Sequence, residues 1–177
     1  KSDTTHFLLR GCNAHGFVYY GIQYDGIRLN SMDNIHIIVR GICLKGKSIL
    51  LAFHKDEEYF FLPGGHVEYG ESMTEALKRE LREELSSDAV PGKLIYIFEH
   101  SWMNKRALQH EINFLFSVRI PKRQKIDSRE KHLEFHWVPM DDLGKVRFLP
   151  EELKKTICRT LIPINKQQIS FLTSLAA

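Results

Sequence analysis

Residues 62–85, LPGGHVEYGESMTEALKRELREEL, place six glutamates in a segment whose apolar residues recur at helical spacing. At about 100° per residue, one side of a helix over this segment gathers Met73, Ala76, Leu77, Leu81 and Leu85. Glu80, Glu83 and Glu84 fall on that side or at its edge. A carboxylate taken out of water must be compensated by a cation or must bind a proton. The chain must therefore fold with both a packed core and a source of positive charge beside this helix.

Two kinds of positive charge can compensate these carboxylates. Arg79, four residues before Glu83 and eight after Glu71, can serve one of them but not all. A hard divalent cation such as Mg²⁺ or Mn²⁺, which prefers oxygen ligands, suits the rest. The alternative is a solvated helix surface with Glu and Lys pairs four residues apart. The helical wheel favours a metal–phosphate site, and so does the preceding Gly64–Gly65 pair, whose backbone can approach a ligand and whose carbonyls are free to join a metal.

Segments rich in Ile, Val and aromatic residues surround the helix and predict strands. Residues 34–44 and 49–55 form a predicted hairpin, because KGKS between them has turn chemistry. A short aromatic strand follows and is ended by Pro63 and the two glycines. Further strands are predicted at 93–102, 110–120 and 133–138, and a closing helix at 150–162. Strands and helices mix without a strict βαβ alternation, which favours an α+β sandwich over a Rossmann-type sheet.

Composition excludes several other classes of protein. A chain of 177 residues fits one domain, and 43% apolar residues are enough for a core. A net charge of +3 is too small to predict nucleic-acid binding, and no apolar run is long enough to cross a membrane. The cysteines, Cys12, Cys43 and Cys158, lie far apart, so we expect no zinc site and a reducing, cytoplasmic setting. The chain begins at Lys1, and the presence of an upstream leader is left open.

The glutamates follow the spacing of a known signature. From Gly65, five residues lead to Glu71, and seven more lead to Arg79, which begins the run RELREEL. This arrangement resembles the pattern G-x5-E-x7-R-E-U-x-E-E-x-G-U of the Nudix hydrolases, in which U is a bulky aliphatic residue. The chain departs from the pattern at its end, where Ser86 and Ser87 replace the glycine and the aliphatic residue. The resemblance covers about 33–160, with LPGG before the helix and WVPMDDL near the end.

This resemblance implies a fold and a division of the chain. We expect an α+β domain, a Nudix-type α/β/α sandwich with a central mixed β-sheet, over 33–165. Residues 1–32 would form an N-terminal arm or extra strands, and 166–177 would form a C-terminal tail. A homodimer is consistent with the family, and the aromatic N-terminal arm could contribute to it.

The resemblance also implies an activity. Members of the family use metal ions to hydrolyse a pyrophosphate bond in a nucleoside diphosphate linked to another group, or in a nucleoside triphosphate. By this likeness, Mg²⁺ (or Mn²⁺) would be bound by the Gly64 carbonyl, Glu80, Glu83 and Glu84. Glu80 would bind the metal or position the attacking water, and the carboxylates would be oriented by Arg79 together with Glu71.

The general base is left open by the resemblance, because it can lie in the motif or on a later loop or strand. Glu111 in HEINFLF is the main candidate outside the motif, and its alternative role is that of an exposed strand residue. Glu130 and Glu134 are weaker candidates. A base must lie within hydrogen-bond reach of the water, which a sequence does not show.

Substrate contacts are expected from Gly65, whose backbone can approach the ligand, and from Tyr59 and Trp102, which could stack on a nucleobase or pack in the structure. Motifs that mark coenzyme A and NADH hydrolases are not visible. Met103 occupies the place of the proline that marks many ADP-ribose hydrolases. Nucleoside triphosphates and nucleotide sugars therefore remain as expected substrates. The rival hypotheses are a Nudix-fold sensor that binds a nucleotide without cleaving it, and an acidic helix that binds a protein partner.

Overall fold

The computed structural model describes residues 8–12, 18–22, 35–104, 107–121, 126, 128–160 and 170–173. Its main sheet consists of β3 (Ile35–Lys45), β4 (Ser48–His54), β5 (Tyr59–Phe61), β6 (Val90–Asn104), β7 (Ala107–Arg119), β8 (Leu133–Pro139) and β9 (Ser170–Thr173). The strand order is β5-β4-β3-β7-β6-β9, and β8 pairs with β4. Because β3 pairs antiparallel with β4 and parallel with β7, the sheet is mixed, as predicted.

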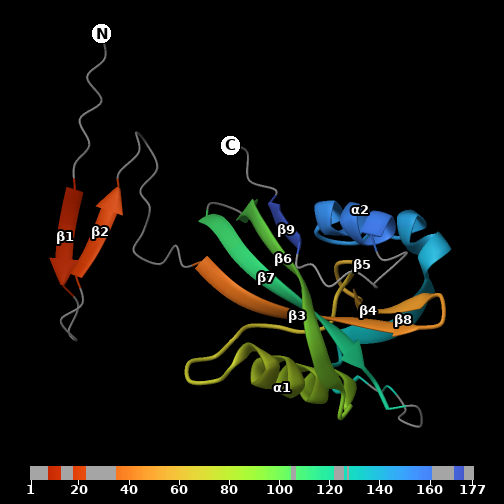
Figure 1. Cartoon of the computed structure of the whole chain (residues 1–177). Helices are drawn as coiled ribbons and strands as arrows, with labels where there is room; N and C mark the ends of the chain where they lie inside the picture. Colours follow the sequence, from red (N-terminus) through yellow and green to blue (C-terminus); the bar gives the residue numbers. More distant parts are fainter. Residues whose placement is uncertain are drawn as a thin grey trace.

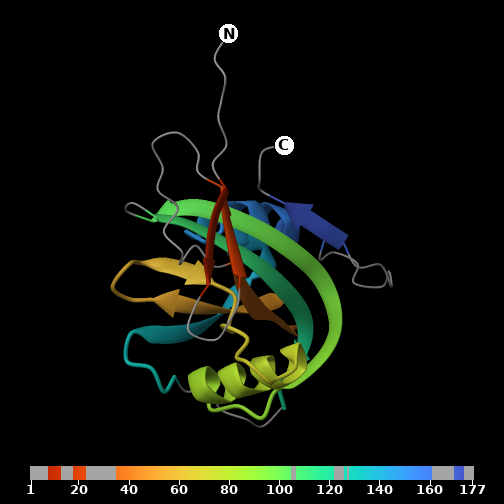
Figure 2. The ribbon, with the colours of Figure 1, turned by 90° about the vertical axis from the view of Figure 1, so that its left-hand side faces the viewer.

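Helices cover both faces of this sheet (Figures 1 and 2). Helix α1 (Met73–Leu85) packs on one face, and α2 (Glu151–Thr160) lies on the other, after the 3₁₀ helix η1 (Met140–Lys145). The predicted α+β sandwich, with its mixed sheet between helices, is confirmed. None of the helices in the described segments has the length and apolar character needed to cross a membrane.

The core is divided into two halves by the sheet, and β4 supplies both. Ile49 and Leu51 pack in the half beneath α2, whereas Leu50 packs in the half that contains Leu81 of α1. Neighbouring residues of a strand point to opposite faces, so a strand covered on both sides needs a continuous apolar run. This explains the sequence ILLA within β4, all four residues of which are buried.

Helix α1 begins with a capping box and ends at a residue in the left-handed conformation. Ser72 caps its first turn: its hydroxyl accepts from the Glu75 amide, while the Glu75 carboxylate accepts from the Ser72 amide. The helix ends at Ser86, which has a left-handed φ of 52°, the conformation for which glycine is preferred. The Ser86 side chain also forms a hydrogen bond at this position: its hydroxyl accepts from the Arg129 guanidinium at 2.8 Å. Ser87, where the pattern expects an aliphatic residue, is buried.

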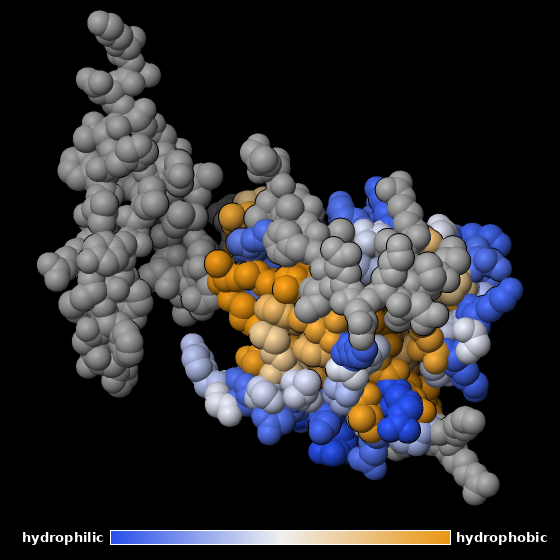
Figure 3. Space-filling view, viewed as in Figure 1, coloured by the Kyte–Doolittle hydropathy of each residue, from blue (hydrophilic) through white to orange (hydrophobic). Residues whose placement is uncertain are grey.

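Hydrophobic side chains remain exposed at the end of the sheet where β3 begins. Ile35, Met103 and Leu108 are 54%, 63% and 46% exposed, and Met103 pairs with Leu108 across β6 and β7. Figure 3 shows an orange area over this part of the sheet. Helix α1 therefore covers its face of the sheet only in part.

Three strands lie in the described parts of the terminal segments. Within 1–32, β1 (Leu8–Cys12) and β2 (Val18–Ile22) pair antiparallel as a separate two-stranded sheet. Within 166–177, where we expected a tail, β9 pairs parallel with β6. The main sheet thus receives a strand from a segment for which the sequence predicted none.

Candidate active site

The loop before α1 forms an additional edge of the main sheet. Three backbone hydrogen bonds of 2.8–3.0 Å join 63–67 to 37–41 of β3. Pro63 lacks an amide proton but still offers its carbonyl, which accepts from Gly41. The edge position brings the loop backbone next to the carboxylates of α1.

Gly64 and Gly65 are required by this close approach. A Cβ added to Gly65 would lie 2.6 Å from the Glu80 carboxylate. Gly64 has a φ of +124°, and a Cβ there would lie 2.2 Å from the Val39 carbonyl oxygen. Only glycine fits both positions, so the glycine of the sequence motif is explained by contact between the loop and the helix.

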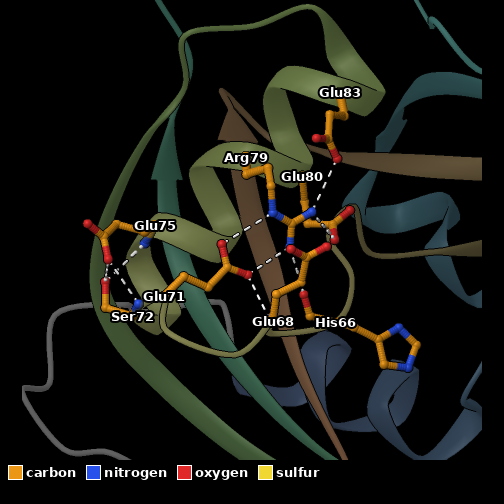
Figure 4. Close-up of polar contacts among 8 residues, drawn as sticks. All are labelled: His66, Glu68, Glu71, Ser72, Glu75, Arg79, Glu80 and Glu83. Atoms are coloured by element: carbon orange, nitrogen blue, oxygen red, sulfur yellow. Dashed lines mark hydrogen bonds and ion pairs between the residues drawn. The ribbon is translucent and has the colours of Figure 1, made fainter.

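Arg79 is the centre of the charged cluster (Figure 4). Its guanidinium contacts Glu71 through Nη2 at 2.8 Å and Nε at 3.2 Å, Glu80 at 2.9 Å and Glu83 at 3.2 Å. It also donates to the His66 carbonyl at 3.0 Å. The hydrogen bond to Glu71 is the main cause of the raised pKa of Arg79. We expect Arg79 to serve one of the three carboxylates Glu80, Glu83 and Glu84, and it contacts two of them, Glu80 and Glu83, in addition to Glu71.

Glu71 anchors this arrangement. Its carboxylate binds Arg79 through both oxygens and also accepts from the Glu68 amide at 2.8 Å. The Arg79 hydrogen bond and the Glu68 amide lower the pKa of Glu71. A bidentate pair fixes the plane of the guanidinium, so Glu71 directs Arg79 toward the helix carboxylates.

The three helix carboxylates differ in burial. Glu84 is 5% exposed, and its Oε2 accepts from the Gly64 amide at 2.9 Å. Burial raises the pKa of Glu84 to about 8, against the opposing effects of the Gly64 amide and Arg40. The side chain of Glu80 is 17% exposed, whereas that of Glu83 is 55% exposed. The helical wheel puts Glu80 and Glu84 on the packed side and Glu83 at its edge, and Glu83 is the most exposed of the three carboxylates.

The donor set suits a hard divalent cation, because all three groups offer oxygen and the buried Glu84 is incompletely compensated. Across the described residues, no three acidic, histidine or cysteine side chains converge as a preformed cation site. Arg79 engages Glu80 and Glu83, while the Gly64 amide engages Glu84. The carboxylates are therefore held by internal partners within one loop–helix unit.

Arg40 on β3 was missed by the sequence analysis. Its Nη1 donates to the carbonyl oxygens of Gly64 and Leu62, and its guanidinium lies 5.5 Å from the centre of the Phe61 ring. The Gly64 carbonyl, which we expected to be free, is thus hydrogen-bonded, although a carbonyl oxygen has a second lone pair. The signal for Arg40 was a lone charge within the apolar run HIIVRGICL.

Glu111 lies on β7, opposite His36 of β3 and His100 of β6. Its carboxylate accepts from the buried Asn113 side chain at 3.3 Å. No direct contact between Glu111 and the motif carboxylates is found in the described part of the chain.

Glu130 and Glu134 line a surface cavity of about 380 Å³ beside β8, and the charge of Glu130 contributes to the raised pKa of Glu84. Glu130 pairs with His132 at 3.1 Å, and Glu134 pairs with His136 at 3.3 Å. Each carboxylate thus already contacts a histidine, and the role of both residues as weaker candidates for the general base stays a prediction.

The two aromatic candidates lie on strands far apart in the sheet, Tyr59 on β5 and Trp102 on β6. Tyr59 stacks on His54 at 5.5 Å, and the Arg147 guanidinium lies 5.9 Å from the centre of its ring. Burial is the main cause of the raised pKa of Tyr59. Trp102 is 37% exposed and stacks on His100 at 5.1 Å. Both rings are therefore already part of aromatic stacks.

Comparison with known proteins agrees with this geometry. A family model described as the NUDIX domain matches residues 35–159. A protein of Methanocaldococcus jannaschii named ADP-ribose pyrophosphatase is 31% identical over 126 residues, which are 70% of this chain and 73% of that protein.

Solved structures share the fold at lower identity. An ADP-ribose pyrophosphatase from Streptococcus suis aligns with a TM-score of 0.59 and 16% identity, covering 79% of this chain and 99% of that chain. A MutT protein from Methanosarcina mazei aligns with a TM-score of 0.58 and 22% identity, covering 71% and 92%. The glycine-rich edge, the Arg79-centred cluster and the buried Glu84 lie within the matched residues, and this chain belongs to the Nudix hydrolase family.

Proposed function

We propose that this chain is a Mg²⁺-dependent pyrophosphohydrolase that cleaves the diphosphate of a nucleoside diphosphate linked to a further group. Family membership supports pyrophosphate hydrolysis in general. The observation that carries the finer proposal is the Arg79-centred cluster of Glu71, Glu80 and Glu83 beside the buried Glu84. Such a concentration of acid groups at a glycine-lined edge suits a cation that accompanies a phosphate ligand.

The proposed metal ligands are Glu80, Glu83, Glu84 and the Gly64 carbonyl. When bound there, Mg²⁺ or Mn²⁺ would neutralise phosphate charge and lower the pKa of a water molecule. The protein supplies orientation: Glu71 fixes Arg79, and Arg79 holds Glu80 and Glu83. Arg40 fixes the direction of the Gly64 carbonyl through its hydrogen bond.

The proton of the attacking water has two candidate acceptors, Glu80 and Glu111. Glu80 lies against Gly65 within the motif, and Glu111 lies on β7 facing the same side as His36. Replacing Glu111 by Gln separates them: loss of kcat with an unchanged metal requirement supports Glu111, whereas full activity assigns the base to the motif.

The substrate proposal follows in part from the relatives. The protein of Methanocaldococcus jannaschii is named ADP-ribose pyrophosphatase, so ADP-ribose is the first substrate to test. Met103, which stands where many ADP-ribose hydrolases carry a proline, keeps nucleotide sugars and nucleoside triphosphates in the same panel. A homodimer and a cytoplasmic setting stay predictions.

The test is a hydrolysis screen with Mg²⁺, Mn²⁺ and EDTA, in which the products are identified by mass. We expect Glu83→Gln and Glu84→Gln to lower turnover by at least about 100-fold with the fold retained, because metal and phosphate charge are no longer balanced. Glu151→Gln is the matched control, since Glu151 lies on α2 and pairs with Lys155. Unchanged activity in both motif variants would refute the metal role.

The alternative function is a nucleotide sensor without turnover. The retained Glu80, Glu83 and Glu84 argue for the enzyme, because a sensor does not need three metal-binding carboxylates. Tight nucleotide binding without product across the whole panel would instead support the sensor.

A further inference from the structure

Three aromatic rings form a ladder along β6. The ring centres of Phe98 and His100 are 5.7 Å apart, and those of His100 and Trp102 are 5.1 Å apart, with planes within 20° of parallel (18° and 19°). Residues two apart in a strand share one face. Phe98 is buried in the core half beneath α2, whereas 37% of Trp102 is exposed. The ladder thus begins in the core and ends in an indole ring that is accessible to a ligand.

A row of polar side chains leads from this ladder to the Nudix motif. Glu111 on β7 is paired in register with His100 on one side and with His36 of β3 on the other. His36 Nδ1 lies 3.2 Å from His66 Nε2, and the His66 carbonyl holds Arg79. Three members of the row, His100, Glu111 and His36, are half-buried, and His66 is exposed.

The length of this row fits a nucleotide. It crosses from β6 to β7, to β3 and to the edge segment 63–67, which is three strand spacings or roughly 14 Å. An outstretched nucleoside diphosphate has about this extent. A ligand whose diphosphate lies at the motif therefore reaches His100 with its base, and Trp102 lies two residues, roughly 7 Å, further along β6.

The chemistry of the two ends is complementary to such a ligand. At the motif end lie Arg79 and the acidic cluster, which suit a diphosphate with its cation. At the other end burial lowers the pKa of His100, so that the ladder is uncharged near neutral pH. Flat, uncharged rings stack well on nucleobases, and the larger purine ring gains more from stacking than a pyrimidine does.

We propose that the nucleobase of the substrate stacks on Trp102 as the next ring of the ladder, and that purine nucleoside diphosphates are the preferred substrate class. The diphosphate end of this inference rests on the proposed function. Trp102 then determines specificity for the base, and His100 is a positioning residue that supports the indole ring from beneath.

Fluorescence of Trp102 measures base stacking without turnover. The chain has two tryptophans, so Trp137→Phe leaves Trp102 as the sole reporter. This protein is titrated, with Mg²⁺ present, with the non-hydrolysable α,β-methylene analogues of ADP and UDP. We expect the ADP analogue to quench Trp102 with a Kd at least about fivefold lower than that of the UDP analogue. Equal Kd values, or binding by calorimetry without a fluorescence change, would overturn the inference.

Kinetics supply the second measurement. Trp102→Leu should raise KM for an ADP-linked substrate about tenfold or more while kcat changes less than about threefold, and Trp102→Phe should restore most of the loss. His100→Ala should raise KM by a smaller factor with the same base preference. Met103→Ala is the matched control, because Met103 is more exposed than Trp102 and lies on the opposite face of β6. An unchanged KM in Trp102→Leu would overturn the inference.

The two proposals fail separately. If no nucleotide is hydrolysed while the ADP analogue still quenches Trp102, the base site stands and the proposed hydrolysis is wrong. If hydrolysis is normal and Trp102 does not respond to the analogue, the base site is wrong and the proposed hydrolysis stands.

Discussion

A series of glycine-to-alanine substitutions tests whether close approach of the loop to α1 builds the site. The same methyl group is added in three different surroundings. At Gly144 it meets nothing within 4 Å, at Gly65 it meets the end of the Glu80 side chain at 2.6 Å, and at Gly64 it meets the Val39 carbonyl oxygen at 2.2 Å.

These surroundings set the expected magnitudes. Gly144→Ala should change the free energy of unfolding by less than about 0.5 kcal/mol. Gly65→Ala should cost about 1–3 kcal/mol, because a flexible carboxylate can move away from the methyl group. Gly64→Ala should cost more than about 3 kcal/mol, since a backbone clash adds to the strain of a φ of +124°.

Gly65→Ala should also lose activity. When Glu80 moves away from the added methyl group of Gly65→Ala, its contact with Arg79 at 2.9 Å is lost. A loss of about 2 kcal/mol of transition-state stabilisation would lower kcat/KM roughly 30-fold. Urea unfolding gives the stabilities, and initial rates at saturating Mg²⁺ give the activities. If Gly65→Ala is as stable and as active as Gly144→Ala, the contact between loop and helix is not what positions Glu80.

Three further predictions concern α1 and the residues at its end. Leu81→Ala should cost about 2–5 kcal/mol of stability in urea unfolding, because Leu81 is 0% exposed. Ser86→Gly should be more stable than Ser86→Ala by about 1 kcal/mol: both lose the hydroxyl that binds Arg129, but only glycine tolerates a φ of 52° without strain. Without metal, the folded-state pKa of Glu84 is raised from 4.5 to about 8, so the folded state holds the proton more tightly and stability falls as pH rises through this window. Unfolding in EDTA at about pH 5.5 and about pH 7.5 should show this fall in the wild type and a smaller one in Glu84→Gln.

The motif was predictable from the sequence because its constraints are local. Gly65, Glu71, Arg79 and Glu84 lie within twenty positions on one loop and one helix. Helical periodicity then fixes which carboxylates lie together. Helical periodicity could not fix how exposed each carboxylate is, because exposure depends on which other segments pack against the last turn of α1. Glu83 near this end is half-exposed, whereas Glu84 turns toward the Gly64 amide.

The contacts that the sheet adds to the candidate site were not predictable, because they depend on the pairing register of segments that are far apart in the sequence. Arg40 reaches a carbonyl 24 residues away, and β9 joins β6 from the end of the chain. The sequence predicted the strand that carries Arg40, but it predicted neither β9 nor the order in which the strands pair. A shift of one residue in register would send each side chain of a strand to the other face.

The motif depends on local sequence, whereas the sheet contacts depend on strand pairing, and this difference has a consequence for substrate specificity. The reacting end of the substrate is proposed to bind at a local motif, whose chemistry can be inferred from residues 65–84 alone. The base end is proposed to meet Trp102 and His100, whose distance from the motif is set by the pairing of β6, β7 and β3. A substitution that alters this register can change the preferred base while every motif residue keeps its contacts. Substrate preference in this chain should therefore respond to changes in the sheet, whereas the ability to cleave a diphosphate should respond to changes in the loop and helix.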